Sequence, residues 1–301
     1  MNKKYKLDKK DTITVIGKKL YRIVALIDIG ESVIAGDKGG YIESEKNLSQ
    51  DGNAWVFDDA IVYDNAKIYG NARVFGRACI CDNAQVYEEA EVREYAWVSG
   101  NAWIYGMAKV RDDAQVFGKA CVHDYASVCV NAQVYDTAKV SGNACVYDNA
   151  CVRGNSWIHD YACVRDNARV SDNVRVYGNA RIAGNACVQG DVMIYGDAQV
   201  CGDAWVSGNT RVSGNARVCD DARISERDDY FCVQSFGSAG RTTTLFRTKN
   251  DWCVISGCFK GPVGEFRQKV KETHSDSLIA QEYLMVADLM EFRIKRRNNE
   301  S

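Results

Sequence analysis

The segment Asn71-Ala72-Arg73-Val74-Phe75-Gly76 is one copy of a six-residue phrase that repeats without interruption over residues 54–224. Val or Ile stands at every sixth position through 29 phrases. Apolar and variable residues alternate within each phrase, which predicts a strand whose Ala and Val point inward. The two residues that follow the strand are mostly Gly or Asp and then Asn or Asp, which tolerate the positive φ of a sharp corner. This fixed period of strand and corner is typical of a solenoid.

The irregular phrases predict how many phrases close one coil. The inward Ala is replaced at four places, each 18 residues from the next. The four replacements are Ser156, Val174, Val192 and Thr210. Outward tyrosines at Tyr69, Tyr87 and Tyr105 have the same spacing. Three phrases per coil would stack each set in one column, so we predict a triangular cross-section, about 10 coils and ~4.8 Å between stacked strands.

Read as Val-x-Gly-Asn-Ala-x, the phrase resembles the hexapeptide repeat of left-handed parallel β-helix proteins over more than half of the chain. The left hand is implied by the resemblance alone, because ordinary parallel crossovers are right-handed. The expected fold class is therefore an all-β solenoid, a single-stranded parallel β-helix, with a small α+β C-terminal cap domain. Proteins of this kind are often acyl- or nucleotidyl-transferases and some are zinc carbonic anhydrases. The resemblance also implies a homo-oligomer and favours a trimer.

The repeat divides the chain into three expected parts. Residues 1–53 form an N-terminal cap, 54–225 form the hexapeptide coils, and 226–301 form a C-terminal module for capping or oligomerisation. Caps are needed because the end coils of a solenoid would otherwise leave unpaired backbone and bare core. In the N-terminal cap, runs of β-formers predict strands at 12–16 and 20–26.

An irregular first coil is predicted before the regular array. Ile42 and Leu48 are six residues apart, but Leu48 and Val56 are eight apart, which indicates a two-residue insertion. The segment that runs from Ala35-Gly-x-x-Gly-Gly-Tyr-Ile to Asn47-Leu-Ser-Gln-Asp-Gly resembles the N-terminal segment of YdcK-type bacterial β-helix proteins. Those proteins carry a transferase label that rests on their fold.

The C-terminal module has lost the six-residue period. Turn residues separate three predicted strands at 230–236, 242–247 and 252–256. Two helices are predicted, at about 262–273 after Pro262 and at about 277–296. The second helix has a wide apolar face, and we expect this domain or another subunit to cover it. The residues of this face are Leu278, Ile279, Tyr283, Met285, Val286, Leu289, Met290, Phe292 and Ile294.

A second resemblance covers part of this module. The sequences Gly-Cys-Phe-Lys-Gly at 257–261 and Glu-Phe-x-x-x-Val-Lys-Glu-Thr-His at 265–274 resemble a module that follows such repeats in prophage and gut-bacterial proteins. That resemblance implies no activity.

Composition narrows the function classes. The net charge of −2 gives no basic field for nucleic acid. No apolar run is long enough for a membrane span or a signal peptide, so we expect a cytoplasmic protein that contacts neither nucleic acid nor membrane. Thirteen scattered cysteines argue against a disulfide framework and favour free thiols. The pairs Cys145/Cys163 and Cys201/Cys219 lie one coil apart and are close enough to cross-link under oxidation.

His123 and His159 are the only histidines of the repeat and continue the outward tyrosine column. An acyltransferase of the hexapeptide type needs a histidine base, so these two are the catalytic candidates under that alternative, with acetyl-CoA as its cofactor. No loop interrupts the coils to shape a site, which favours a structural role for both rings. Three histidines at metal-binding spacing are absent, so no metal site and no other cofactor are expected.

The C-terminal module contains further candidates. Cys258 and His274 are a conceivable nucleophile pair. If a small ligand, of unknown identity, binds outside the coils, its expected place is near Arg241, Arg247 and His274. The preferred hypothesis is a non-catalytic scaffold or binding protein that acts through flat β faces and the C-terminal module. The alternatives are the acyltransferase and a phage-borne binding module that acts through residues 226–301.

Overall fold

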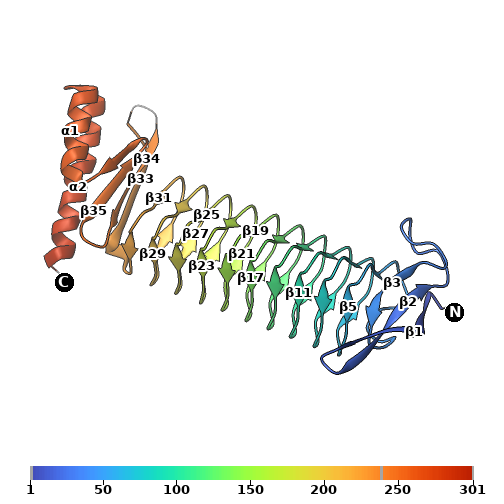
Figure 1. The fold of residues 1–301 in the computed structure, drawn as a ribbon. Coiled ribbons are helices and arrows are strands. Elements are labelled where there is room, and N and C mark those ends of the chain that lie inside the picture. Colours follow the sequence, from blue (N-terminus) through green and yellow to red (C-terminus); the bar gives the residue numbers. More distant parts are fainter. Residues whose placement is uncertain (1–2, 238–239, 300–301) are drawn as a thin grey trace. The chain divides into compact units, whose positions relative to one another are not determined.

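The computed structural model describes residues 3–237 and 240–299, apart from the side chain of Arg241. The chain forms two compact units, Met1–Tyr161 and Ala162–Ser301. Both contain coils of a parallel β-solenoid, about ten in all, which confirms the predicted fold class (Figure 1). The left hand, the triangular cross-section and the boundaries at residues 53 and 225 stay predictions.

In the first unit, two-residue strands recur every six residues and fall in rotation into three parallel sheets. One sheet contains β4 (Trp55–Val56), β7 (Arg73–Val74), β10 (Glu91–Val92), β13 (Lys109–Val110), β16 (Ser127–Val128) and β19 (Cys145–Val146). The second contains β5 (Ile61–Val62), β8 (Cys79–Ile80), β11 (Trp97–Val98), β14 (Gln115–Val116), β17 (Gln133–Val134) and β20 (Cys151–Val152). The third contains β6 (Lys67–Ile68), β9 (Gln85–Val86), β12 (Trp103–Ile104), β15 (Cys121–Val122), β18 (Lys139–Val140) and β21 (Trp157–Ile158).

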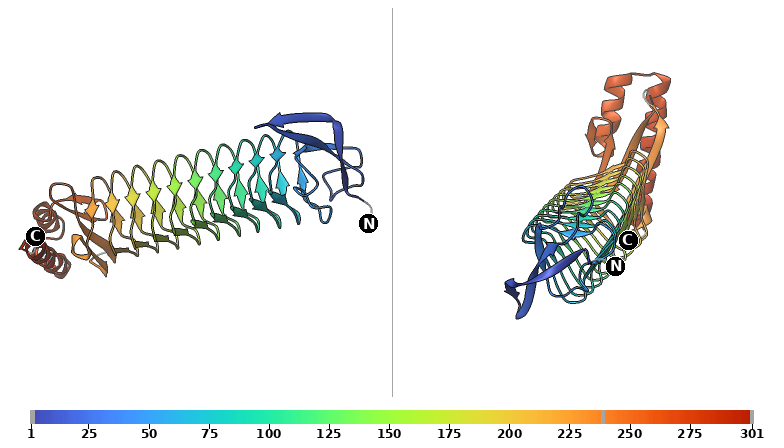
Figure 2. Two further views of the ribbon diagram at one scale, coloured as in Figure 1. Left: turned by 90° about the horizontal axis from the view of Figure 1, so that it is seen from below. Right: turned by 90° about the vertical axis from the view of Figure 1, so that its right-hand side faces the viewer.

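The register confirms 18 residues per coil. Val92 pairs with Val74 on one side and with Val110 on the other, and successive coils stack in this way along the unit (Figure 2). The inward Ala and Val of the phrases are fully buried, as Ala72 and Val74 illustrate. The predicted tyrosine column is also confirmed, because the ring centroids of Tyr69 and Tyr87 are 4.8 Å apart and nearly parallel. The small Ala/Val core is thus reinforced by a continuous backbone ladder and by stacked rings.

Where the corner of a phrase is Asp, its side chain also makes a hydrogen bond that the turn propensity does not predict. Asp82 adopts φ 58°, and its carboxylate accepts a hydrogen bond from the N–H of Gly100, 18 residues later, at 2.8 Å. Asp124 does the same for Gly142 at 3.0 Å. An acidic corner therefore caps the corner of the next coil. This bond, together with His123, lowers the pKa of Asp124 against the opposing effect of burial.

Substituting Gly106 tests this corner. Its φ is +70°, and an added Cβ would lie 2.7 Å from the backbone nitrogen of Asp124. We expect Gly106→Ala to reduce the free energy of unfolding by about 1–2 kcal/mol, from the left-handed backbone and the close contact. Gly106→Asp has the same backbone strain but adds a carboxylate that can accept the Asp124 N–H, so it should cost less. Urea denaturation compares the two variants, and equal losses would rule out a contribution from the corner carboxylate.

The N-terminal cap is an antiparallel hairpin of β1 (Tyr5–Val15) and β2 (Lys18–Ala25), which a third strand joins to the coils. This strand, β3 (Lys38–Ile42), pairs antiparallel with β2 and in parallel with β5. Ile42 pairs with Val62 and Leu48 bridges to Ile68, each 20 positions along the chain. The regular coils have an offset of 18, so the predicted two-residue insertion before Val56 is confirmed. Both hairpin strands are longer than predicted.

A buried lysine fixes this cap to the first coil. The Lys4 ammonium donates hydrogen bonds to the carbonyl oxygens of Gly52, at 3.2 Å, and Ala54, at 3.0 Å. Burial lowers the pKa of Lys4 to about 8. The Tyr5 hydroxyl donates to the carbonyl oxygen of Leu48 at 2.7 Å. These donors satisfy carbonyl groups at the start of the solenoid, where no earlier coil exists to pair with them.

The second unit continues the same pattern of three parallel sheets. One contains β22 (Cys163–Val164), β25 (Arg181–Ile182), β28 (Gln199–Val200) and β31 (Arg217–Val218). The next contains β23 (Arg169–Val170), β26 (Cys187–Val188), β29 (Trp205–Val206) and β32 (Arg223–Ile224). The last contains β24 (Arg175–Val176), β27 (Met193–Ile194) and β30 (Arg211–Val212). Arg175 pairs with Met193, so the buried Val174 and Val192 occupy equivalent places in neighbouring coils, as predicted.

An antiparallel sheet and two helices complete the second unit. After a short 3₁₀ helix, η1 (Arg227–Asp229), the sheet has the order β33 (Tyr230–Phe236), β34 (Arg241–Arg247), β35 (Trp252–Ser256) and β36 (Phe259–Gly261). Helices α1 (Val263–His274) and α2 (Leu278–Asn299) pack against this sheet (Figure 1). The predicted strands and helices are confirmed within three residues at each end. The short strand β36 was not predicted.

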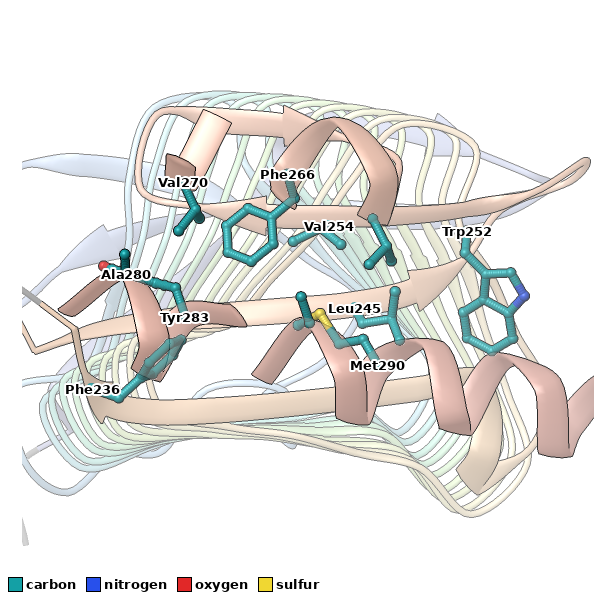
Figure 3. Close-up of a cluster of buried hydrophobic side chains, with 11 residues drawn as sticks. Phe236, Leu245, Trp252, Val254, Phe266, Val270, Ala280, Tyr283 and Met290 are labelled. Atoms are coloured by element: carbon teal, nitrogen blue, oxygen red, sulfur yellow. The ribbon is translucent and has the colours of Figure 1, made fainter. Parts of the chain in front are cut away.

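The covered face of α2 is narrower than the sequence predicted. Phe266 of α1, Tyr283 and Met290 of α2 and Leu245 of β34 belong to one buried cluster (Figure 3). On α2 the buried stripe is Ala280, Tyr283, Ala287 and Met290. The remaining apolar residues of the predicted face do not all lie in this core. The exposed residues are Leu278, Ile279, Met285, Leu289 and Phe292.

The prediction of free thiols is wrong for one pair. Cys201 and Cys219 form a disulfide, with their Cα atoms 4.5 Å apart. They occupy the same outward position in neighbouring coils, directly after β28 and β31. The coil spacing brings the two side chains within bonding distance, which is the cross-link that the 18-residue separation made conceivable.

Candidate functional site

The coil histidines lie on the surface of the first unit, each beside an acidic corner. His123 Nδ1 is 3.2 Å from the carboxylate of Asp124, and His159 Nδ1 is 3.1 Å from that of Asp160. The ring of His123 stacks on Tyr105 with centroids 4.8 Å apart, whereas His159 lies against Trp157 at 4.4 Å. Both histidines therefore have a packing role, and a carboxylate orients each ring as in a histidine base. The two are not brought into one site, since they stand two coils apart.

A hollow of about 430 Å³ lies in the C-terminal module, between α1 and the β35–β36 turn. Cys258 and His274, the predicted nucleophile pair, both line it. His274 stacks on Tyr283 at 5.5 Å, and Tyr283 in turn contacts Phe236 and Phe266 (Figure 3). The hollow has an aromatic and aliphatic floor with two cationic side chains among its lining residues. Such a composition suits a small ligand with an apolar body and an anionic group.

Arg247 does not line this hollow. Its guanidinium lies 3.7 Å from the carboxylate of Asp229, which is fully buried and also binds Arg297 Nε at 3.0 Å. Asp229 therefore draws Arg247 into a structural ion-pair cluster. The side chain of Arg241 lies outside the described part of the chain. Of the predicted ligand-binding residues, His274 thus lines this hollow, whereas Arg247 does not.

The structure adds an arginine-rich hollow that sequence reasoning missed. It has a volume of about 560 Å³, and Arg211, Arg227 and Arg293 all line it. Arg211 is an outward residue of the coil strand β30, whereas Arg227 belongs to η1 and Arg293 to α2. Only the tertiary fold brings these three elements together. Asp228 forms an ion pair with Arg293 at 3.1 Å and partly offsets the positive charge.

The exposed side of α2 is a further candidate surface. Leu278, Met285, Leu289 and Phe292 have 82%, 64%, 46% and 63% of their surface exposed. Their spacing of seven, four and three residues places them in one stripe along the helix. Isolated exposed apolar residues are ordinary, but a continuous stripe of large ones marks an interaction site.

Two kinds of site are missing from the described residues. Within residues 3–237 and 240–299, no three His, Cys, Asp or Glu side chains are grouped closely enough to hold a metal ion. Neither helix of that part is sufficiently apolar along its length for a membrane crossing.

Comparison with known proteins concerns the coils. The model of the YdcK β-solenoid repeat matches residues 168–182 and 198–214. Both stretches belong to the second unit, in the coils that contain β23 to β25 and β28 to β30. The predicted resemblance to YdcK-type β-solenoid proteins is therefore confirmed by the coils, and residues 35–52, which suggested it, lie outside the match. No curated protein matches the chain.

Proposed function

Because this chain is a parallel β-solenoid of the YdcK type, we propose that it is a non-catalytic scaffold that associates with a second copy of itself through the exposed stripe of α2. The observation that carries the proposal is the row of Leu278, Met285, Leu289 and Phe292 on the solvent side of this 22-residue helix. Covering these side chains would remove their apolar surface from water, at ~25 cal/mol per Å².

The spacing favours another α2 helix as the occupant. Alternating intervals of four and three residues are the a/d positions of a coiled coil, with Glu282, Leu289 and Arg296 at the a positions. A parallel pair would set Glu282 against Glu282 and Arg296 against Arg296. An antiparallel pair, with its two-fold axis at Leu289, sets Glu282 against Arg296 and Met285 against Phe292 of the partner subunit. Glu282 also accepts a hydrogen bond from the Gly237 N–H, and Arg296 also forms an ion pair with Asp228 in the same chain. The sulfur–aromatic contact and the absence of facing like charges therefore favour the antiparallel arrangement.

Placing a charge on the two-fold axis tests the proposal. Leu289→Glu would bring two carboxylates together, so we expect self-association to weaken by at least about thirtyfold, the effect of losing one interface hot spot. Light scattering should then give a mass near 33.5 kDa for the variant and twice that value for the natural chain. Asn298→Asp is the matched control, since Asn298 is exposed on the same helix outside the stripe.

Two outcomes would count against this assembly. A natural chain that is monomeric at tens of micromolar would exclude the dimer. A natural chain of three times the monomer mass that Leu289→Glu does not dissociate would favour the trimer implied by the hexapeptide resemblance, with contacts elsewhere.

An acetyl-CoA-dependent acyltransferase is the second candidate function. The observation in its favour is the contact of His123 Nδ1 with Asp124, which would leave Nε2 to accept a proton from a substrate. His159 has the same arrangement. A thermal shift with acetyl-CoA that disappears in His123→Ala or His159→Ala would support catalysis and weigh against a purely structural role.

A further inference from the structure

Three cysteines meet at one hollow of the second unit. The hollow has a volume of about 350 Å³. It is lined by the disulfide-bonded Cys201 and Cys219 and by Cys258, which is a free and exposed cysteine. Two of these residues come from neighbouring coils, and the third comes from the antiparallel sheet. Their meeting is a product of the tertiary fold, and the assembly through α2 has no part in it.

The position of Cys258 is fixed by a tight hairpin. Ser256 pairs with Phe259, so Gly257 and Cys258 are the two turn residues between β35 and β36. Gly257 has φ 59°, the conformation that glycine adopts without strain at the first position of such a turn. The hairpin is also attached to the coil beside the disulfide, because Lys260 forms an ion pair with Asp220, the residue after Cys219, at 2.5 Å. Cys258 is thus held as a lining residue of the same hollow as Cys219.

The electrostatic surroundings suit thiol chemistry. Arg217 lines the same hollow and adds a positive charge to it, whereas Lys260 and Asp220 are ion-paired with each other and their charges offset. Cys258 is exposed, so small thiols from solution can reach it, and a hollow of this size admits such a molecule.

We propose that Cys201, Cys219 and Cys258 form a thiol–disulfide exchange site. The Cys258 thiolate attacks Sγ of Cys219, a Cys219–Cys258 bond forms, and the Cys201–Cys219 bond breaks. The electron pair of the broken bond leaves on Cys201, which takes up the proton that Cys258 released. The step is redox-neutral and needs no other oxidant. It changes a link between two coils into a link between the coil and the β35–β36 hairpin. Low-molecular-weight thiols are the external substrate class, because they can open the same disulfide and be displaced by Cys258.

Peptide mapping of the full chain tests this exchange. The oxidised protein is incubated at pH 8 with a substoichiometric amount of glutathione, quenched with acid, alkylated and digested with trypsin without reduction. Cys219 lies in peptide 218–223, Cys201 in 182–211 and Cys258 in 250–260. We expect peptide 218–223 linked to 182–211 at the start, and a growing fraction linked to 250–260.

Two variants decide the outcome. Cys258→Ser should reduce the linkage to peptide 250–260 at least tenfold, whereas Cys232→Ser, which changes a partly exposed thiol of β33, should leave it unchanged. Persistence of this linkage in Cys258→Ser would assign it to the buried Cys253 of the same peptide and overturn the proposal. A natural chain that keeps only the original linkage, or never forms it on oxidation, would overturn it as well.

Discussion

Replacing Asp229 by Ala is expected to destabilise the C-terminal module, residues 226–299, by about 3–5 kcal/mol, the cost of leaving one partner of a buried ion pair unmatched. The Asp229 side chain is fully buried, and it accepts hydrogen bonds from the N–H groups of Ser225 and Glu226 at 3.0 Å. Its other oxygen binds Arg297 Nε at 3.0 Å. The change therefore leaves two backbone donors and the Nε–H of the nearly buried Arg297 without this acceptor, while Arg297 Nη2 keeps its ion pair with Glu226 at 3.2 Å. Hydrogen exchange of α2 and urea denaturation measure the loss.

A double substitution separates the charge from the packing. Asp229→Ala combined with Arg297→Met removes both charges and should recover a large part of the loss, because no buried charge is left unpaired. Hydrogen bonds from Ser225, Arg297 and Glu226 outweigh the effect of burial, so the pKa of Asp229 is lowered. Its stabilisation is accordingly present above the unfolded pKa of about 3.9 and lost as the pH falls through the folded pKa. If Asp229→Ala were as stable as the natural chain, the hydrogen bond between Arg297 of α2 and the Asp229 carboxylate would contribute nothing to holding α2 in place.

Proline at position 115 is expected to have the next largest effect, because it removes a ladder hydrogen bond of the first unit and leaves a buried carbonyl group unpaired, at a cost of about 1–3 kcal/mol for that group alone. Gln115 lies in β14, which pairs with β11 and β17, and its N–H donates to the carbonyl oxygen of Ala132 at 2.9 Å. Proline has no N–H, and its ring would crowd the next strand of the ladder. Hydrogen exchange across β11, β14 and β17 locates the damage.

Gln115→Val is the matched control for the proline variant. The side chain points outward and is partly exposed, and valine keeps the N–H and favours extended backbone, so stability should change by less than about 0.5 kcal/mol. Equal destabilisation by Val and Pro would show that the glutamine side chain matters here and the ladder bond does not.

The candidate sites were less predictable than the coils. His123 and His159 were placed correctly on the outward column, because a strict period fixes the direction of every side chain in the array. The hollow beside His274 needed the packing of α1 on β35 and β36, and the arginine hollow needed three elements that are distant in sequence. Asp229 could not be predicted as the partner of Arg247, because the whole strand β33 lies between them in the sequence.

Four features could be predicted without coordinates: the solenoid, the 18-residue coil, the two-residue insertion before Val56 and the alternation of buried and exposed positions. All of these follow from local periodicity, because each phrase repeats the same strand and corner and stacks on an almost identical copy. Which stripe of α2 is buried, and that Cys258 lies beside the Cys201–Cys219 pair, could be learned from the three-dimensional packing alone. These features depend on how an aperiodic sheet and two helices pack against the last coils, and such contacts have no repeating signal in the chain.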